Sequence, residues 1–191
     1  MFASSDMGFG PALTLGAPAT LVSTIASVTH KAGKSGDLVF VEVDRAIRQG
    51  GETCVAERQT IVYRGDGGRT APVETRLQAI GAGDEVWTPG PVDLFRFSAV
   101  TFNSHRIHYD APYASEVEGY PGLVVHGPFT AARLFAYAQR RSGAPLKTFA
   151  FRAMAPMFCG QPIRLTVGET AGEVVAVRAD GSTGMSAKFE V

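Results

Sequence analysis

The chain has 191 residues, 45% of them hydrophobic and 19% charged, and its 18 lysines and arginines balance its 18 aspartates and glutamates. This composition is typical of a globular protein with an apolar core, and a net charge of zero provides no basic surface for nucleic acid. No apolar run is long enough to cross a bilayer, and the amino terminus lacks the basic and apolar parts of a secretory leader. We therefore expect a cytoplasmic protein with no nucleic-acid or membrane partner, in which the isolated Cys54 and Cys159 are free thiols.

The first part of the chain, residues 1–64, is predicted to consist mostly of strands. Its strand segments are rich in β-branched residues or alternate apolar with polar residues, and they cover 19–29, 38–48 and 53–63. A glycine-containing turn separates the first two, and the Gly50-Gly51 pair is typical of a hairpin between the last two. We expect an antiparallel meander.

Residues 65–92 break this pattern, because glycine, proline and charges of both signs dominate there. Such a composition is typical of a linker between two structural units. We expect a linker with a single helical turn near 74–79, after which the second unit covers residues 93–191.

The second unit is predicted to hold one long helix among strands. A short strand is expected at 94–100 and a short helix at 113–117. From Pro128 onward, apolar residues recur at helical spacing, and Gly143 marks the end of this helix. Strand-like segments follow at 146–155, 161–169, 172–178 and 184–191, so we expect an antiparallel sheet wrapped around a helix.

Three of the four histidines, His105, His108 and His126, fall between residues 95 and 130. Histidine titrates near neutral pH, so this cluster indicates acid–base chemistry, a metal site, or a loop braced by hydrogen bonds. The HxxHxD spacing offers three ligand types, but no further Cys/His cluster completes a metal set. The spacing alone leaves catalysis and bracing open.

His126 is followed by Gly127 and Pro128 at the start of the predicted long helix. The amino terminus of a helix has free N–H groups and the positive end of the helix dipole, which can polarise a carbonyl oxygen. Gly127 would allow a substrate to approach the backbone closely. A tight turn into the helix would explain the same glycine without any function.

Two long motifs, TFNSHRIHYD at 101–110 and EGYPGLVVHGPFTA at 118–131, resemble those of the MaoC-like hotdog-fold hydratases and dehydratases of acyl thioesters. The resemblance is greatest to the type 2 3-hydroxyacyl-thioester dehydratase and mesaconyl-C4-CoA hydratase branch. It continues through FAFRAMAPMFCGQPIRL to the carboxyl terminus and back through STIASVTHKAGKSGDLVFVEV.

The resemblance implies roles for individual residues. The family's catalytic histidine falls on His108, its catalytic aspartate on Asn103 and its oxyanion-hole glycine on Gly127. An amide does not titrate, so Asn103 is expected to orient water or the substrate hydroxyl while His108 transfers the proton. Other positions in the motifs are expected to contact substrate, namely His105, Tyr109, Asp110, His126 and Pro128. No metal or cofactor is implied.

The implied fold is α+β, a double hotdog in which an antiparallel sheet wraps around a central helix. Its amino-terminal hotdog is expected to be incomplete, because the first strand and central helix have no evident counterpart in residues 1–18. An incomplete hotdog would leave apolar surface uncovered, so we expect a homo-oligomer, most simply a dimer.

The implied activity is reversible addition of water to an enoyl-CoA, or its elimination from a 3-hydroxyacyl-CoA or carrier-protein thioester, with a mesaconyl-C4-CoA-like dicarboxylic substrate among the candidates. One alternative is a thioester-binding hotdog protein with little or no catalysis, indicated by Asn103. Another is a thioesterase, for which Asp110 and Glu116 are the nearby carboxylates.

Overall fold

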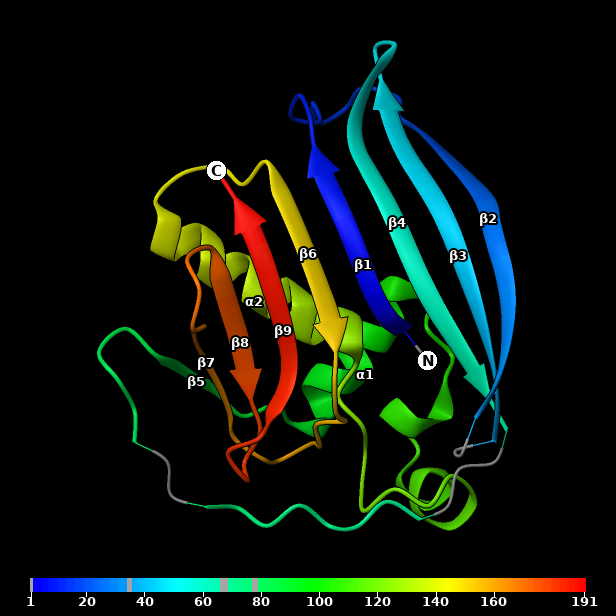
Figure 1. Cartoon of the computed structure of the whole chain (residues 1–191), viewed down its shortest axis with the longest axis vertical. Helices are drawn as coiled ribbons and strands as arrows, with labels where there is room; N and C mark the ends of the chain where they lie inside the picture. The colour runs from blue at the N-terminus through cyan, green and yellow to red at the C-terminus, as the bar shows by residue number, and fades with distance from the viewer. Residues whose placement is uncertain (1, 34–35, 66–68, 77–78) are drawn as a thin grey trace.

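The computed structural model describes residues 2–33, 36–65, 69–76 and 79–191, which form one antiparallel sheet with helices against it. The strands lie in the order β2-β3-β4-β1-β6-β9-β8-β7-β5 (Figure 1). Their bounds are β1 Phe2–Phe9, β2 Thr20–Gly33, β3 Gly36–Gln49, β4 Glu52–Arg64, β5 Glu85–Trp87, β6 Thr148–Ala153, β7 Ile163–Val167, β8 Glu173–Val177 and β9 Thr183–Glu190. The predicted meander is confirmed as β2, β3 and β4, and the four predicted carboxyl-terminal strands are confirmed as β6 to β9.

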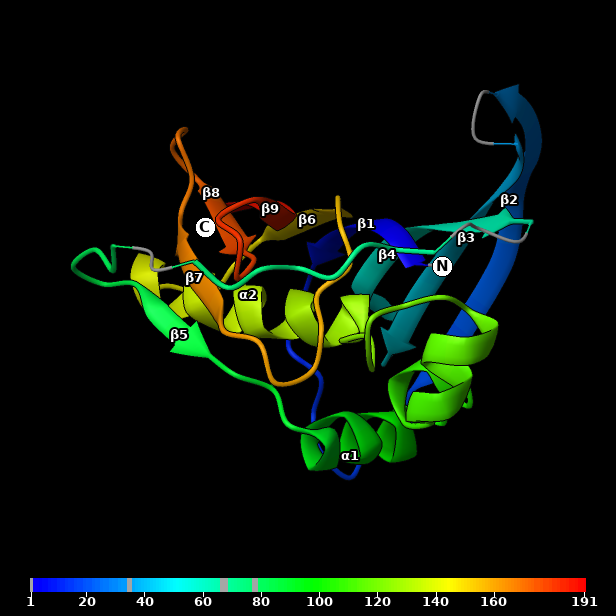
Figure 2. The same cartoon turned by 90° about the horizontal axis from the view of Figure 1, so that it is seen from below.

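Two α-helices, α1 (Pro91–Thr101) and α2 (Gly127–Ser142), lie on one side of the sheet in the described residues. Between them run a 3₁₀ turn, η1 (Arg106–His108), and a single π turn, η2 (Tyr113–Val117). Helix α2 packs on β6, β8, β9 and β1, and α1 lies on the side of α2 away from the sheet (Figure 2). Neither α-helix is long and apolar enough to cross a membrane.

The structure confirms the predicted start and end of the long helix, α2. Pro128 occupies the first turn, where its missing N–H costs no helical hydrogen bond. Gly143 ends the helix with a φ of 68°, a left-handed conformation that suits glycine, and its N–H donates to the Gln139 carbonyl. Arg140 and Arg141 stand in the last turn, where positive charge offsets the helix dipole.

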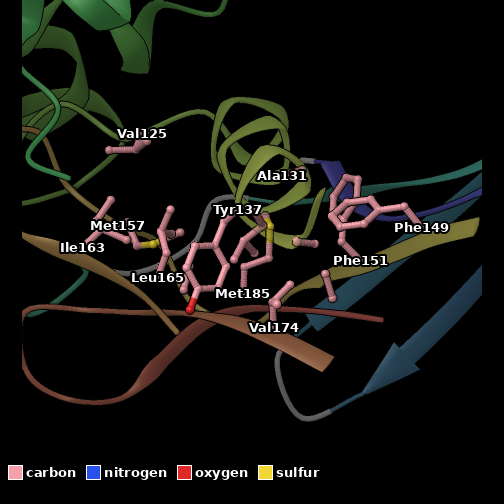
Figure 3. Close-up of a cluster of buried hydrophobic side chains, with 14 of the residues drawn as sticks. Val125, Ala131, Tyr137, Phe149, Phe151, Met157, Ile163, Leu165, Val174 and Met185 are labelled. Carbon is pink, nitrogen blue, oxygen red and sulfur yellow. The ribbon is translucent and has the colours of Figure 1, made fainter. Parts of the chain in front are cut away.

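The main core lies between α2 and the sheet (Figure 3). Leu134 and Tyr137 of α2 meet Phe149 of β6 and Met185 of β9, and all four are at most 1% exposed. The Tyr137 hydroxyl donates to the Gly83 carbonyl at 3.0 Å, so the buried ring keeps a partner for its polar end. This packing holds α2 in place, and with it the start of α2 at Gly127.

The predicted strand at 94–100 is wrong, because these residues belong to α1. Pro91 begins the helix, and the Asp93 carboxylate accepts the Gly90 N–H at 2.8 Å, which caps the amino terminus. Leu94 and Ser98, four residues apart, are the buried positions of α1. The alternation of apolar and polar residues in this segment resembles a strand, and the cap, not the alternation, decides the structure.

The predicted linker at 65–92 needs correction in its second half. Residues 85–87 form β5, which pairs with β7 at the edge of the sheet. Just before it, Asp84 forms an ion pair with Arg164 at 2.9 Å. The expected helical turn at 74–79 is absent from residues 74–76 and 79, and residues 77–78 lie outside the described part of the chain.

Residues 2–9 form β1, a strand that the sequence does not predict. Ser, Asp and Gly have low strand propensity, but β1 pairs with β4 on one side and β6 on the other, and these two ladders override it. Ser5, at its centre, is fully buried and donates to Glu57 at 2.6 Å. β1 therefore joins the amino-terminal and carboxyl-terminal strands into one sheet.

The sheet face that packs on α2 continues across β4, β3 and β2 with apolar residues. Cross-strand pairing aligns Phe9 of β1 with Val55, Ile47 and Leu21 on successive strands. Helix α2 runs beneath the half of the sheet that holds β6 to β9, and β2 and β3 extend beyond it (Figure 2). On β2, Leu21 and Ile25 are 53% and 67% exposed. Apolar side chains of β2 are therefore left uncovered at this edge of the sheet.

Candidate active site

The end of α1 sets the path of the histidine loop. Phe102 closes the helix with a φ of 52°, a left-handed conformation that is uncommon for a bulky residue. The Asn103 N–H then donates to the Ser98 carbonyl at 2.9 Å. This sharp turn directs the chain away from α1 and into the loop that carries Asn103, His105 and His108.

Asn103 closes a short turn with its own side chain. Its Oδ1 accepts the His105 N–H at 3.0 Å, an Asx turn of the kind that asparagine favours. The amide NH₂ group of Asn103 is then left as the side chain's hydrogen-bond donor. Asn103 can therefore donate from a fixed position, and it cannot take up a proton.

His108 is buried, with only 7% of its surface exposed, and one of its ring nitrogens is hydrogen-bonded to the backbone. Nδ1 lies 2.7 Å from the Val124 carbonyl, which can only accept, so Nδ1 carries the proton. Nε2 then has a free lone pair, and no described residue is hydrogen-bonded to it. Burial lowers the pKa of His108 to about 4, which keeps the ring neutral near pH 7.

His126 lies against His108 as a second buried imidazole. The two ring centroids are 3.7 Å apart with an angle of 19° between the planes. Nε2 of His126 lies 2.8 Å from the Ser98 hydroxyl of α1. Burial, and then the neighbouring His108, lower the pKa of His126 to about 3, so both rings are neutral at pH 7.

Gly127 follows His126 as the first residue of α2. Helix α2 makes its first hydrogen bond from the Thr130 N–H to the His126 carbonyl, which leaves the Gly127 N–H as a free donor at the helix start. A side chain at Gly127 would meet only the Phe2 carbonyl at 3.8 Å and Met185 at 4.0 Å, both ordinary contacts. The fold therefore has room for a residue larger than glycine here.

The other predicted contacts divide into two groups. In the first group, His105 is exposed, and its ring centroid lies 5.6 Å from that of His108. Pro128 lies in the first turn of α2, next to Gly127.

The second group, Tyr109 and Asp110, is bound to other residues of the same loop. The Tyr109 hydroxyl donates to the Ser104 carbonyl at 2.8 Å, and the Asp110 carboxylate binds Arg106 at 2.7 Å and the Tyr113 N–H at 3.1 Å. These contacts brace the loop and lower the pKa of Asp110, chiefly through Arg106.

The structure brings His108, His126 and the start of α2 together, with Asn103 tied to the same loop. Two residues that hold the histidines in place, Ser98 and Val124, are not predicted from the sequence. Ser98 is hidden because its segment resembles a strand, and Val124 acts through a backbone carbonyl that every residue carries. No group of three or more histidines, cysteines, aspartates or glutamates placed to hold a metal ion lies within the described ranges.

Comparison with solved structures defines the fold class. HtdX from Mycobacterium tuberculosis superposes with a TM-score of 0.77 at 18% identity, over 100% of this chain and 76% of that one. A MaoC-like dehydratase from Phytophthora capsici gives 0.67 at 16% identity, over 100% of this chain and 71% of the other. The expected α+β hotdog fold of MaoC-like proteins is therefore confirmed.

Sequence comparison defines the family. The profile of hydroxyacyl-thioester dehydratase type 2 matches residues 1–159, and the chain belongs to this family. It is 42% identical over 197 aligned positions to the mesaconyl-C(4)-CoA hydratase of Chloroflexus aurantiacus, covering 100% of this chain and 70% of that protein. The mitochondrial hydroxyacyl-thioester dehydratase type 2 of Schizosaccharomyces pombe is 34% identical over 122 positions, which cover 62% of this chain and 41% of the relative.

The two buried histidines predict a loss of stability in mild acid. In the unfolded chain a histidine has a pKa near 6.5, whereas in the fold His108 and His126 have pKa values of about 4 and about 3. The unfolded chain therefore binds protons first as the pH falls below 6.5. The free energy of unfolding should decrease by up to about 1.4 kcal/mol per pH unit for each histidine.

Urea unfolding between pH 7 and pH 5, above the range in which carboxylates titrate, measures this slope. A His108→Gln protein should show a clearly smaller slope than the wild type. A wild-type free energy of unfolding that does not change over this range would contradict the burial of two neutral imidazoles.

Proposed function

We propose that the protein catalyses the reversible addition of water to an enoyl thioester and its elimination from the 3-hydroxyacyl thioester. The observation that carries this proposal is the buried His108, which is neutral, has a free Nε2 lone pair and stacks on His126, the residue directly before Gly127. A base beside a carbonyl-binding donor is what this elimination requires, and membership of the dehydratase family supports it.

His108 is proposed to move the proton. In hydration, Nε2 takes a proton from water while the water oxygen bonds to C3 and the C2=C3 electrons shift toward the thioester. The imidazolium then returns a proton to C2, and dehydration reverses these steps. A placed base of this kind contributes about 10²- to 10⁴-fold to the rate.

Gly127 is proposed to hold the thioester oxygen. Enolate character develops on that oxygen as C2 gains or loses its proton, and the Gly127 N–H with the positive end of α2 stabilises it. One such donor is worth about 3 kcal/mol in the transition state. The surroundings of Gly127 support this role. A Cβ atom would fit there without a clash, so packing does not require glycine, whereas close approach of the thioester carbonyl to the backbone does.

Asn103 is proposed to orient the water or the 3-hydroxyl group through its amide NH₂. This follows from the occupied Oδ1, which accepts from His105. Of the other residues expected to bind substrate, His105 and Pro128 keep that role as a proposal, since they border His108 or Gly127, whereas the full burial of His126 supports a bracing role for its ring. The engaged side chains of Tyr109 and Asp110 support a bracing role.

The substrate is proposed to be a CoA thioester, an enoyl-CoA or 3-hydroxyacyl-CoA. Two relatives support this class. The name of the Chloroflexus protein specifies mesaconyl-C(4)-CoA, and that of the yeast protein a hydroxyacyl thioester. Among the candidates, a C4-dicarboxylic enoyl-CoA is the first to test, because the Chloroflexus protein matches the whole of this chain.

Thioester hydrolysis is the second candidate, since an acyl-ACP thioesterase from Bacteroides thetaiotaomicron shares the fold with a TM-score of 0.57 at 10% identity. Hydrolysis needs a carboxylate free to activate water at the carbonyl. Asp110 is bound to Arg106, which weighs against it. The measurement of thiol release in the assay below separates the two reactions.

We also propose a cytosolic homodimer. The unpaired Cys54 and Cys159 support a reducing compartment, and the exposed apolar residues of β2, among them Ile25, support self-association. Sedimentation equilibrium should give twice the mass of the chain. An Ile25→Asp protein should shift toward the monomer, and a wild type that is monomeric at micromolar concentration would rule out the dimer.

Incubation with mesaconyl-C4-CoA or crotonyl-CoA should remove the absorbance of the conjugated double bond without releasing free thiol. His108→Ala should lower turnover by about 10²-fold or more, because the base is lost. Thiol release at the rate of absorbance loss would instead identify a thioesterase. Equal rates for wild type and His108→Ala on every substrate would show that His108 is not the base.

The amide of Asn103 should matter for turnover rather than for folding. Asn103→Ala removes both the Asx turn and the donor, so kcat should fall strongly. Asn103→Asp keeps an acceptor for the His105 N–H and should retain part of the activity. Steady-state kinetics with thermal unfolding as a control tests this, and a fully active Asn103→Ala protein would exclude the orienting role.

A further inference from the structure

A serine of α1 is the only hydrogen-bond partner that the described residues offer to the side chain of His126. The Ser98 hydroxyl lies 2.8 Å from Nε2, whereas Nδ1 is buried without a partner. His126 itself is 0% exposed and Ser98 6%, so water does not compete for this contact. Apolar side chains usually occupy buried helix positions, so a serine there is explained by the hydrogen bond that its hydroxyl forms.

This hydrogen bond fixes the ring of His126 whichever atom donates. If His126 donates from Nε2, the Ser98 proton and the Nδ1 lone pair lack partners. If Ser98 donates, the Nδ1–H of His126 and the Ser98 lone pairs lack partners, so the two tautomers leave equal numbers of groups unpaired. Loss of the contact would leave Nε2 unpaired as well, and burying an unpaired polar group costs about 1–3 kcal/mol. Ser98 therefore holds the Nε2 edge of the His126 ring in place.

The contact reaches His108 through ring stacking. The centroid of the His126 ring lies 3.7 Å from that of the His108 ring, and the rings are nearly parallel. A positive charge on one ring therefore disfavours protonation of the other. Phe97, also on α1, packs on His126 at 4.8 Å and confines it from the helix side. The orientation and the charge of His126 thus act directly on His108.

Few charged groups act on this pair of rings. His105 is the other titratable group whose charge affects both of them. Arg106 of η1 is paired with Asp110, α1 contributes the uncharged Ser98 and Phe97, and α2 contributes its amino terminus. The low pKa of His126 therefore depends mainly on burial, and then on His108 and His105.

We propose that Ser98 is a positioning residue for the reaction: its hydrogen bond to Nε2 of His126 holds that ring face to face with His108. This inference rests on the proposed role of His108 as the base. Ser98 acts through His126 and does not itself touch substrate. Loss of the hydroxyl would free the His126 ring to turn and so disturb the stacked His108 ring.

Three variants test the proposal. Ser98→Ala removes the hydroxyl, Ser98→Thr keeps it, and Ser142→Ala, at the far end of α2, controls for loss of any serine hydroxyl. With mesaconyl-C4-CoA or crotonyl-CoA, Ser98→Ala should lower kcat by roughly tenfold, the size of one lost hydrogen bond, with little change in KM. The acid limb of its kcat/KM profile should shift, because the ring that faces His108 loses its hydrogen bond. Ser98→Thr should restore most of both, and Ser142→Ala should behave as the wild type.

A second measurement needs no activity. Imidazole ¹⁵N spectra of the substrate-free protein should show a single fixed tautomer of His126 in the wild type, and in Ser98→Ala the His126 signals should shift or average between tautomers. An inactive wild type with these spectra would refute the proposed function and leave the Ser98–His126 coupling intact. Unchanged spectra together with an unchanged acid limb in Ser98→Ala would overturn the positioning role.

Discussion

The hydrogen bond from His108 Nδ1 to the Val124 carbonyl is the contact on which the proposed chemistry depends. It selects the tautomer with a free Nε2, and it ties the loop after α1 to the segment that leads into α2. Val124 is itself held, since its N–H donates to the Ile107 carbonyl and it bridges to Phe158. The base and the helix start are thereby fixed relative to each other by backbone contacts.

The surroundings of His108 explain why a carboxylate is unnecessary for placing the ring. A backbone carbonyl orients it on one edge and the His126 ring supports its face. Asn103, at the position where related motifs have an acid, is occupied with its own turn and offers a donor. In the proposed mechanism, His108 is then the one base and Asn103 the one donor, and burial keeps His108 neutral.

Much of the fold follows from local sequence signals. The alternation in β3, the paired glycines before β4 and the Pro128-to-Gly143 limits of α2 are decided by neighbouring residues, so they are predictable. The strand predicted at 94–100 is wrong because alternation such as that around Phe97 and Ser98 fits a strand equally well, and the cap at Gly90 decides for a helix. β1 and β5 depend on distant partners, and no local pattern reveals them.

The same division holds for the site. His108, Asn103 and Gly127 stand in motifs that the sequence displays, and a motif identifies residues without giving their hydrogen bonds. The ion pair of Asp110 with Arg106 depends on the local turn of the loop, four residues long. That Ser98 meets His126 follows from how α1 packs against the start of α2. Contacts between elements far apart in the chain are set by packing, so they need the structure.

The place of β1 between β4 and β6 has a consequence for how the protein is made. Gly8 pairs with Thr148, so the central ladder joins residues that are 140 positions apart in the chain. Pairing over such a separation is slow, because the entropy of closing the loop is lost before the contact forms. During synthesis β1 emerges before β6 and keeps one unpaired edge until β6 has left the ribosome. The nascent chain is therefore most prone to aggregation through β1, and β6 ends that interval.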